Sequence, residues 1–193
     1  MPVSRDAGKG QADSLAAYLQ ISWGLPLGAA RSAPPLPRTI LPSEVVRLAL
    51  SSGDLRLVRA LPLWLSLIPK VDPPPPWWPV DDRRRLAYLC EISRALASLR
   101  RDRGHVRGDS WPASAAGIQP GRWRERVPLC ESPGPAAAPS MFGERWGIEE
   151  PMTFPEYVAF QDQFLSLKRR KQGDGARAGT DRRGPEEADP PLR

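Results

Sequence analysis

The chain has 193 residues, which is enough for one domain of ordinary size with tails or for two very small ones. Its 24 prolines and 16 glycines, with 40% hydrophobic residues, predict a modest core with long irregular connections and exclude a wholly low-complexity chain. The net charge of +6 arises in one stretch, residues 82–126, where 11 arginines accompany 5 acidic residues and favour a polyanion or an acidic partner.

The N-terminal part is predicted to contain one short helix. Residues 1–12 are polar and are expected to be loose, and a helix begins at Asp13 or Ser14. Four apolar residues then recur at helical spacing: Leu15, Tyr18, Leu19 and Trp23. Gly24 and Pro26 end this helix, and residues 25–42, with five prolines, are interpreted as an extended linker.

Two further helices are predicted before residue 69. Ser43 is expected to cap the first, and Asp54 the second, which runs towards Ile68 and should be kinked or split at Pro62. This helix is apolar on all sides, so it is either buried in the core or held against a partner. The pair also allows a helix-turn-helix interpretation, but proline and the apolar flanks favour a helical hairpin packed into the core.

Residues 69–80 are predicted to form a stiff polyproline connector, either a docking peptide or a spacer with Trp77 and Trp78 folded onto the helices. The spacer is favoured. A fourth helix, 83–101, starts after a cap at Asp81 or Asp82 and carries one apolar stripe. The residues of this stripe are Leu86, Leu89, Ile92, Leu96 and Leu99.

Residues 102–150 show no sustained periodicity and are expected to be an irregular basic region. Either its tryptophans pin it to the helices or it is mobile. A capped helix then spans 151–171, where Thr153 and Glu156 form a capping box, and residues 172–193 are predicted to be disordered. The sequence thus predicts an all-α protein: a small irregular helical domain, 13–101, within a chain of four to five helices.

The leading functional hypothesis is a basic surface on the fourth helix and the following region. Arg83, Arg94 and Arg101 are separated by near-whole numbers of turns and should share one side of the helix. Further arginines and two tryptophans continue the surface: Arg103, Arg107, Arg122, Arg124, Trp111 and Trp123. Arginines with interleaved aromatic rings suit nucleic-acid backbone contact and base stacking, or an acidic protein partner. The alternative is a solvated face whose arginine stems cover apolar surface.

The alternative hypothesis is a protein-only interaction module, such as a toxin-neutralising or assembly subunit, with oligomerisation possible. Here the apolar helices 55–68 and 153–171 would be buried against another chain. The interface would use these residues of the first helix: Leu57, Leu61, Trp64, Leu65 and Ile68. The regulatory or adaptor role belongs to the leading hypothesis, the basic surface that contacts nucleic acid or an acidic partner.

Neither an enzyme nor a cofactor or metal site is expected. His105 is the only histidine, and Cys90 and Cys130 lack the close-paired spacing of structural zinc ligands. Cys90 has Arg94 one turn away, which could activate its thiol, but a buried structural cysteine is favoured. Two cysteines do not make a disulfide framework, and neither a signal peptide nor a membrane-spanning run is visible. A cytoplasmic protein without a membrane partner is therefore expected.

Overall fold

The fold is all-α, which confirms the predicted class. The computed structural model describes residues 5–28, 36, 40–68, 73–102, 118–121, 123–130 and 140–180, with side chains left aside at 5–9, 101–102 and 169–180. These ranges hold six helices and two short strands. The elements are α1 (Arg5–Trp23), α2 (Pro42–Ser52), α3 (Leu55–Leu65), α4 (Val80–Asp102), β1 (Val127–Pro128), α5 (Met141–Trp146), β2 (Ile148–Glu149) and α6 (Phe154–Thr180).

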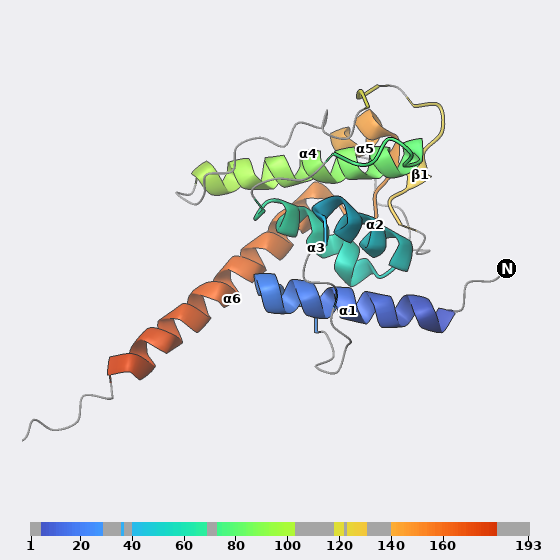
Figure 1. Ribbon diagram of the computed structural model, residues 1–193. Coiled ribbons are helices and arrows are strands. Elements are labelled where there is room, and N and C mark those ends of the chain that lie inside the picture. Colours follow the sequence, from blue (N-terminus) through green and yellow to red (C-terminus); the bar gives the residue numbers. More distant parts are fainter. Residues whose placement is uncertain are drawn as a thin grey trace, which may run out of the picture.

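The helices form layers, with α2 and α3 between α1 and α4 (Figure 1). The centre of the core is α3, whose Leu57 and Leu61 are fully buried and whose Trp64 meets Trp23 of α1 edge to face, with ring centroids 6.4 Å apart. A helix in a middle layer needs apolar residues on every side, because both faces exclude water. Of the two explanations for the all-round apolar helix, burial in the chain's own core is the one observed.

The starts of α2 and α3 differ from each other. Asp54 caps α3 as predicted, since its carboxylate accepts the Arg56 N–H at 2.9 Å. Ser43 does not cap α2: Leu41 holds that position without a side-chain bond, and Pro42 starts the helix. Proline suits a first helical position because its missing N–H would have no partner there. Pro62 does not split the helix, because α3 continues through it to Leu65; the helix ends there, short of the predicted Ile68.

Both long terminal helices exceed their predicted bounds. The segment expected to be loose is helical from Arg5, and α6 continues past residue 171 to Thr180. Glycines in both extensions argued against helix, but propagating a helix from a packed segment adds one hydrogen bond per residue without a new nucleation step. Figure 1 shows the outer part of α6 leaving the packed helices. The remaining tail, 181–193, lies outside the described residues.

The expected polyproline connector is not extended at its end. The Trp78 N–H donates to the Pro75 carbonyl at 3.0 Å, which closes a turn just before α4. Trp78 is buried by this turn, whereas Trp77 remains 69% exposed. Only one of the two tryptophans therefore folds onto the helices. The linker predicted at 25–42 also begins as packed chain, because Leu25 and Leu27 are buried.

The region 102–150 contains regular structure that the sequence did not reveal. Ser140 caps α5 by accepting two backbone N–H groups, and β1 pairs in parallel with β2, with Val127 opposite Ile148. Trp146, fully buried, fixes α5 against α4. For the described parts of this region, the alternative in which tryptophans pin it to the helices is the one observed.

Across the described ranges, none of the helices combines the length and the apolar character that a bilayer crossing requires.

Candidate functional site

The predicted row of arginines on α4 is only partly open to solvent. Arg94 is exposed and Arg83 is half-buried, as their spacing on one side of the helix allows. Between them on the same side, Ala87 and Cys90 are buried, so the row is not a continuous exposed face. The side chain of Arg101 is not described. Four other residues of the predicted surface lie outside the described residues: Arg103, Arg107, Trp111 and Arg122.

Arg84, which sequence reasoning passed over, is the arginine that organises this part of the molecule. It is 4% exposed, and its Nε donates to the Trp146 carbonyl at 3.0 Å. Its Nη2 donates to the carbonyls of Glu125 at 2.9 Å and Gly147 at 2.8 Å. The planar guanidinium thus holds two backbone segments, one at Glu125 and one at Trp146 and Gly147, on α4, which its fork of donors is suited to do.

The remaining contacts of Arg84 balance its charge. Nη1 pairs with Asp81 Oδ1 at 2.9 Å, one turn earlier on α4. The guanidinium also lies over the ring of Trp123, with 4.1 Å between its central carbon and the ring centroid. We call this unit the Arg84 clamp: the Arg84 side chain, the Trp123 ring, and the carbonyls of Glu125, Trp146 and Gly147.

Gly147 makes the clamp sterically possible. Its φ is +61°, in the left-handed region, and a Cβ there would collide with Arg84 Nη2 and with Trp123 Cβ. A side chain would therefore both strain the backbone and displace the clamp. The sequence signal available was Gly147 following Trp146, a pattern typical of a helix C-terminus, but it does not say which arginine approaches it.

Trp123 was predicted to be a base-stacking platform, and the clamp occupies one of the two faces of its ring. One face of its ring is covered by Arg84, so that face is not available to a nucleobase. Its role in the described structure is to hold the segment 123–127 on α4. An aromatic ring close to arginines in the sequence can thus pack against an arginine of the same chain, and need not bind a ligand.

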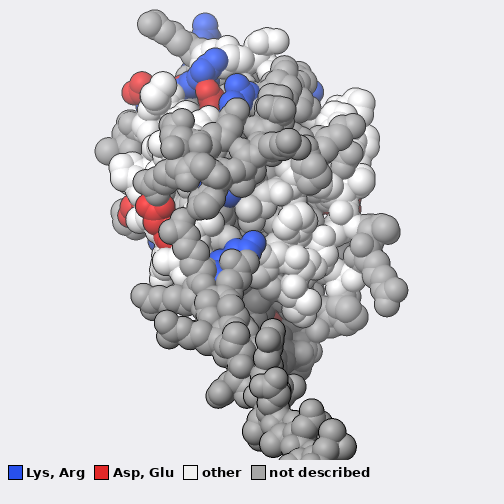
Figure 2. Space-filling view, turned by 90° about the vertical axis from the view of Figure 1, so that its left-hand side faces the viewer, with Lys and Arg blue, Asp and Glu red and all other residues white. Residues whose placement is uncertain are grey.

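Arg124 and Arg126 are the exposed basic residues beside the clamp. They flank Glu125, whose carbonyl Arg84 holds. On the face that Figure 2 presents, which is the left-hand side of Figure 1, basic side chains gather mainly at the top. Acidic side chains lie among them, so this is a mixed surface with a basic excess.

Other arginines of the described chain have internal ion pairs. Arg85 pairs with Asp82 at 2.7 Å, and Arg145 with Glu91 at 2.8 Å. The second oxygen of Glu91 accepts the indole N–H of Trp146. Arg100 is buried and donates to the Ser66 carbonyl at 2.8 Å, and burial lowers its pKa. Part of the basic excess in residues 82–126 is therefore engaged in contacts within the protein.

The residues predicted to face a partner chain lie instead in the protein's own core. Leu57, Leu61 and Leu65 are fully buried, Trp64 is 2% exposed and Ile68 is 7% exposed. Their surface is already covered by the neighbouring layers, because α3 lies between α1 and α4. In the described arrangement, α3 offers no apolar face to a second protein.

A buried polar cluster joins α4, α5 and β2. The Tyr88 hydroxyl donates to Glu150 Oε1 at 2.8 Å, and Ser140 donates to both oxygens of the same carboxylate at 2.6 Å. Burial, with the nearby Tyr157 and Glu150, raises the pKa of Tyr88, and burial likewise raises that of Tyr157. Phenols that stay protonated are donors, so the cluster satisfies buried carboxylate oxygens and fixes the start of α5.

Cys90 is not an activated thiol. Burial raises its pKa to about 12, and this outweighs the opposite influence of Arg94. Among the described residues, no group of three His, Cys, Asp or Glu side chains could hold a metal ion. His105 lies outside the described residues. The buried structural interpretation of Cys90 is therefore the one that the structure supports.

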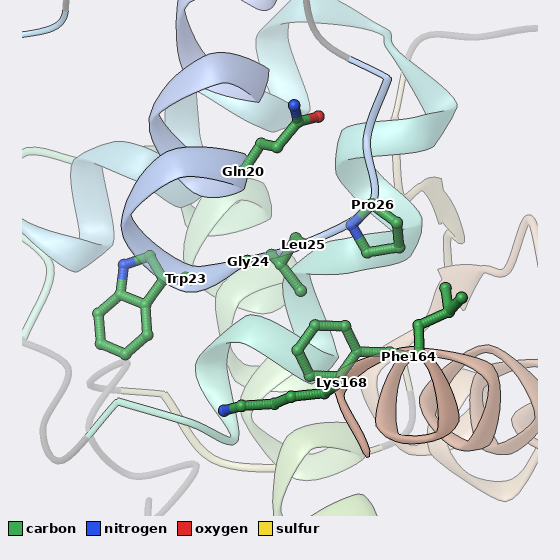
Figure 3. Close-up of a pocket in the computed structure, with 8 residues that line it drawn as sticks. Gln20, Trp23, Gly24, Leu25, Pro26, Phe164 and Lys168 are labelled. Atoms are coloured by element: carbon green, nitrogen blue, oxygen red, sulfur yellow. The ribbon is translucent and has the colours of Figure 1, made fainter. Parts of the chain in front are cut away.

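A pocket of about 400 Å³ lies between the C-terminal turn of α1 and α6 (Figure 3). Its walls are mainly apolar, with an amide and an ammonium group among them. The lining residues are Gln20, Trp23, Gly24, Leu25, Pro26, Phe164, Leu167 and Lys168. Sequence analysis had assigned these residues only to helices and a linker, because the pocket exists only once α6 crosses the end of α1.

Comparisons with known proteins found no counterpart: no family model, no curated protein and no solved structure matches the chain.

Proposed function

We propose that this protein is a non-enzymatic regulatory or adaptor protein that binds a polyanion, with nucleic acid as the first candidate, through the exposed arginines beside the Arg84 clamp. The presentation of Arg124 and Arg126 carries the proposal. Both side chains are exposed, while Arg84 holds the carbonyl of Glu125 between them at 2.9 Å. Cations on a fixed backbone lose less conformational freedom on binding than cations on a free loop.

The charge distribution supports a polyanionic partner. The stretch 82–126 carries 11 basic and 5 acidic residues, and one of the 11, Arg94, is an exposed cation on α4. Because Arg84 covers one face of Trp123, stacking should contribute little, and contacts to phosphates should dominate. Such binding would be weakly sequence-specific and strongly dependent on salt. It would take place in the cytoplasm, where two free, buried cysteines stay reduced.

The test is fluorescence anisotropy of a labelled DNA duplex and a labelled single-stranded RNA, from low to physiological salt. The double variant Arg124→Gln/Arg126→Gln should bind more weakly. The negative slope of log affinity against log salt should become shallower by about 2, which is about 1 for each lost phosphate contact. Arg47→Gln is the matched control, because Arg47 is exposed on α2, outside the basic stretch. It should leave the slope unchanged.

Two outcomes would overturn the proposal for nucleic acid. One is no binding at low salt, and the other is a double variant with the slope of the original chain. Binding of an acidic polypeptide in place of nucleic acid, lost in the same double variant, would reassign the surface to a protein partner.

A further inference from the structure

The pocket between α1 and α6 is separate from the Arg84 clamp and has the dimensions of a ligand site. Its volume of about 400 Å³ falls within the range of roughly 300–1,000 Å³ typical of small-molecule pockets. One wall comes from the end of α1 and the chain after it, namely Trp23, Leu25 and Pro26. The other comes from α6, where Leu167 lines the pocket and Phe164 faces the α1 wall (Figure 3).

The α1 wall is fixed by the way that helix ends. Gly24 has a φ of +73°, and its N–H donates to the Gln20 carbonyl at 3.0 Å, which turns the chain back on itself. Leu25 is thereby buried, with its N–H directed to the Leu19 carbonyl at 3.5 Å. Trp23 packs edge to face on the buried Trp64. The wall is therefore largely formed before any ligand arrives, which lowers the entropic cost of binding.

Lys168 supplies the charge at this site. It lies one turn after Phe164 on α6 and is exposed, and no ion pair of its ammonium group occurs within the described ranges. Figure 3 shows its side chain running past the ring of Phe164 towards the Trp23 side of the pocket. An apolar slot with one cation at its edge is complementary to a molecule with an apolar body and one negative charge.

We propose that this pocket binds a small amphipathic carboxylate, such as an aryl- or alkyl-substituted short acid. Its apolar body would lie between Trp23 and Phe164, and its carboxylate would pair with the Lys168 ammonium group. A cationic ligand would be repelled by Lys168, and a neutral ligand would form no ion pair with its ammonium group. The competing explanation is that Lys168 only offsets the negative C-terminal end of α1, which requires no ligand.

The experiment compares 4-phenylbutyrate with its uncharged amide, 4-phenylbutyramide, by calorimetric or NMR titration of the full chain. The acid should bind up to about fivefold more tightly than the amide, the range expected for one solvent-exposed ion pair. Lys168→Gln should remove this preference and leave the affinity for the amide unchanged. Leu167→Trp, which fills the pocket from a 38% exposed position, should abolish the binding of both compounds.

The controls separate ligand binding from folding. Lys168→Gln should keep the thermal midpoint of the original chain, because Lys168 is exposed. Arg47→Gln, an exposed cation on α2, should keep the preference for the acid. The proposal is overturned if neither compound binds, if acid and amide bind equally, or if the preference for the acid survives in Lys168→Gln.

Discussion

Replacing Arg84 with methionine tests whether the clamp holds segment 123–130 and α5 on α4. The change removes three hydrogen bonds from a charged donor, an ion pair with Asp81 and a cation–π contact with Trp123. Bonds from a charged donor contribute about 1.5–3 kcal/mol each and a cation–π contact about 0.5–2 kcal/mol, but such terms do not add.

The expected loss of stability depends on which backbone carbonyls are left without a hydrogen-bond donor. The Gly147 carbonyl keeps the Val127 N–H at 2.9 Å, whereas those of Trp146 and Glu125 lose the guanidinium. We therefore expect Arg84→Met to lower the free energy of unfolding by about 3–5 kcal/mol, because two carbonyls lose a charged donor at about 1.5–3 kcal/mol each. For a chain of this size that corresponds to a fall in the thermal midpoint of roughly 6–20 °C.

The assay is urea and thermal unfolding followed by circular dichroism, with Arg85→Met as the matched control. Arg85 has the same kind of pair, to Asp82 at 2.7 Å, and one carbonyl contact, to Pro128 at 2.9 Å, but its side chain is 20% exposed. Its loss should cost about 1 kcal/mol or less. If Arg84→Met destabilises the protein no more than Arg85→Met, the clamp does not hold this region and the reasoning is refuted.

Four further predictions concern single residues. Gly147→Ala should cost about 1 kcal/mol more than Gly53→Ala in urea unfolding, because both have a positive φ but only Gly147 has no space for a Cβ. Glu156→Gln should lower the free energy of unfolding near pH 7, and this effect should disappear as the pH falls well below 4.5. The reason is that hydrogen bonds from Thr153 lower the pKa of Glu156 in the folded protein, so the carboxylate stabilises the fold above that pKa and no longer does so below it. Leu61→Ala should cost about 2–5 kcal/mol in the isolated chain, as a core residue does. Cys90, whose pKa is about 12, should resist alkylation by iodoacetamide in the native protein at pH 8 and react on unfolding, as mass spectrometry would show.

Each of these has a clear contrary result. Equal costs at the two glycines would mean that the contacts at Gly147 relax freely. A pH-independent effect of Glu156→Gln would mean that its carboxylate is not held by the cap. A stable monomer with Leu61→Ala that loses binding to another chain would restore the partner-interface hypothesis. Rapid native alkylation of Cys90 would show that α4 opens.

The sequence predicted well those helices whose buried face and caps follow from the residues of the helix itself. The stripe of α4 is buried where it was expected at Leu86, Leu89, Ile92 and Leu96, while its last member, Leu99, is half-buried. The capping box of α6 is also present, with the Thr153 N–H donating to Glu156 at 2.7 Å, although the Thr153 hydroxyl donates to the same carboxylate instead of accepting an N–H. Local hydrogen bonds and amphipathic spacing are properties of short segments, so they can be read without the fold.

The features that the sequence concealed depend on residues far apart in the chain. Three consecutive arginines begin α4, and nothing local shows that Arg84, not Arg83 or Arg85, turns inward. That choice follows from the rotation of α4, which the packing of α3 and α5 fixes. The clamp joins Arg84 to residues 41 and 63 positions later. The pocket between α1 and α6 likewise needs two segments that no short-range pattern relates.

The Arg84 clamp also changes what the net charge implies about binding. Counting every arginine between 82 and 126 as a phosphate contact overestimates the surface, because Arg84, Arg85 and Arg100 are bound internally. Arg94, Arg124 and Arg126 are the exposed arginines of this stretch within the described ranges. Three phosphate contacts would give a salt slope of about −2.7 on duplex DNA. A much steeper measured slope would place further contacts on the residues between 101 and 122.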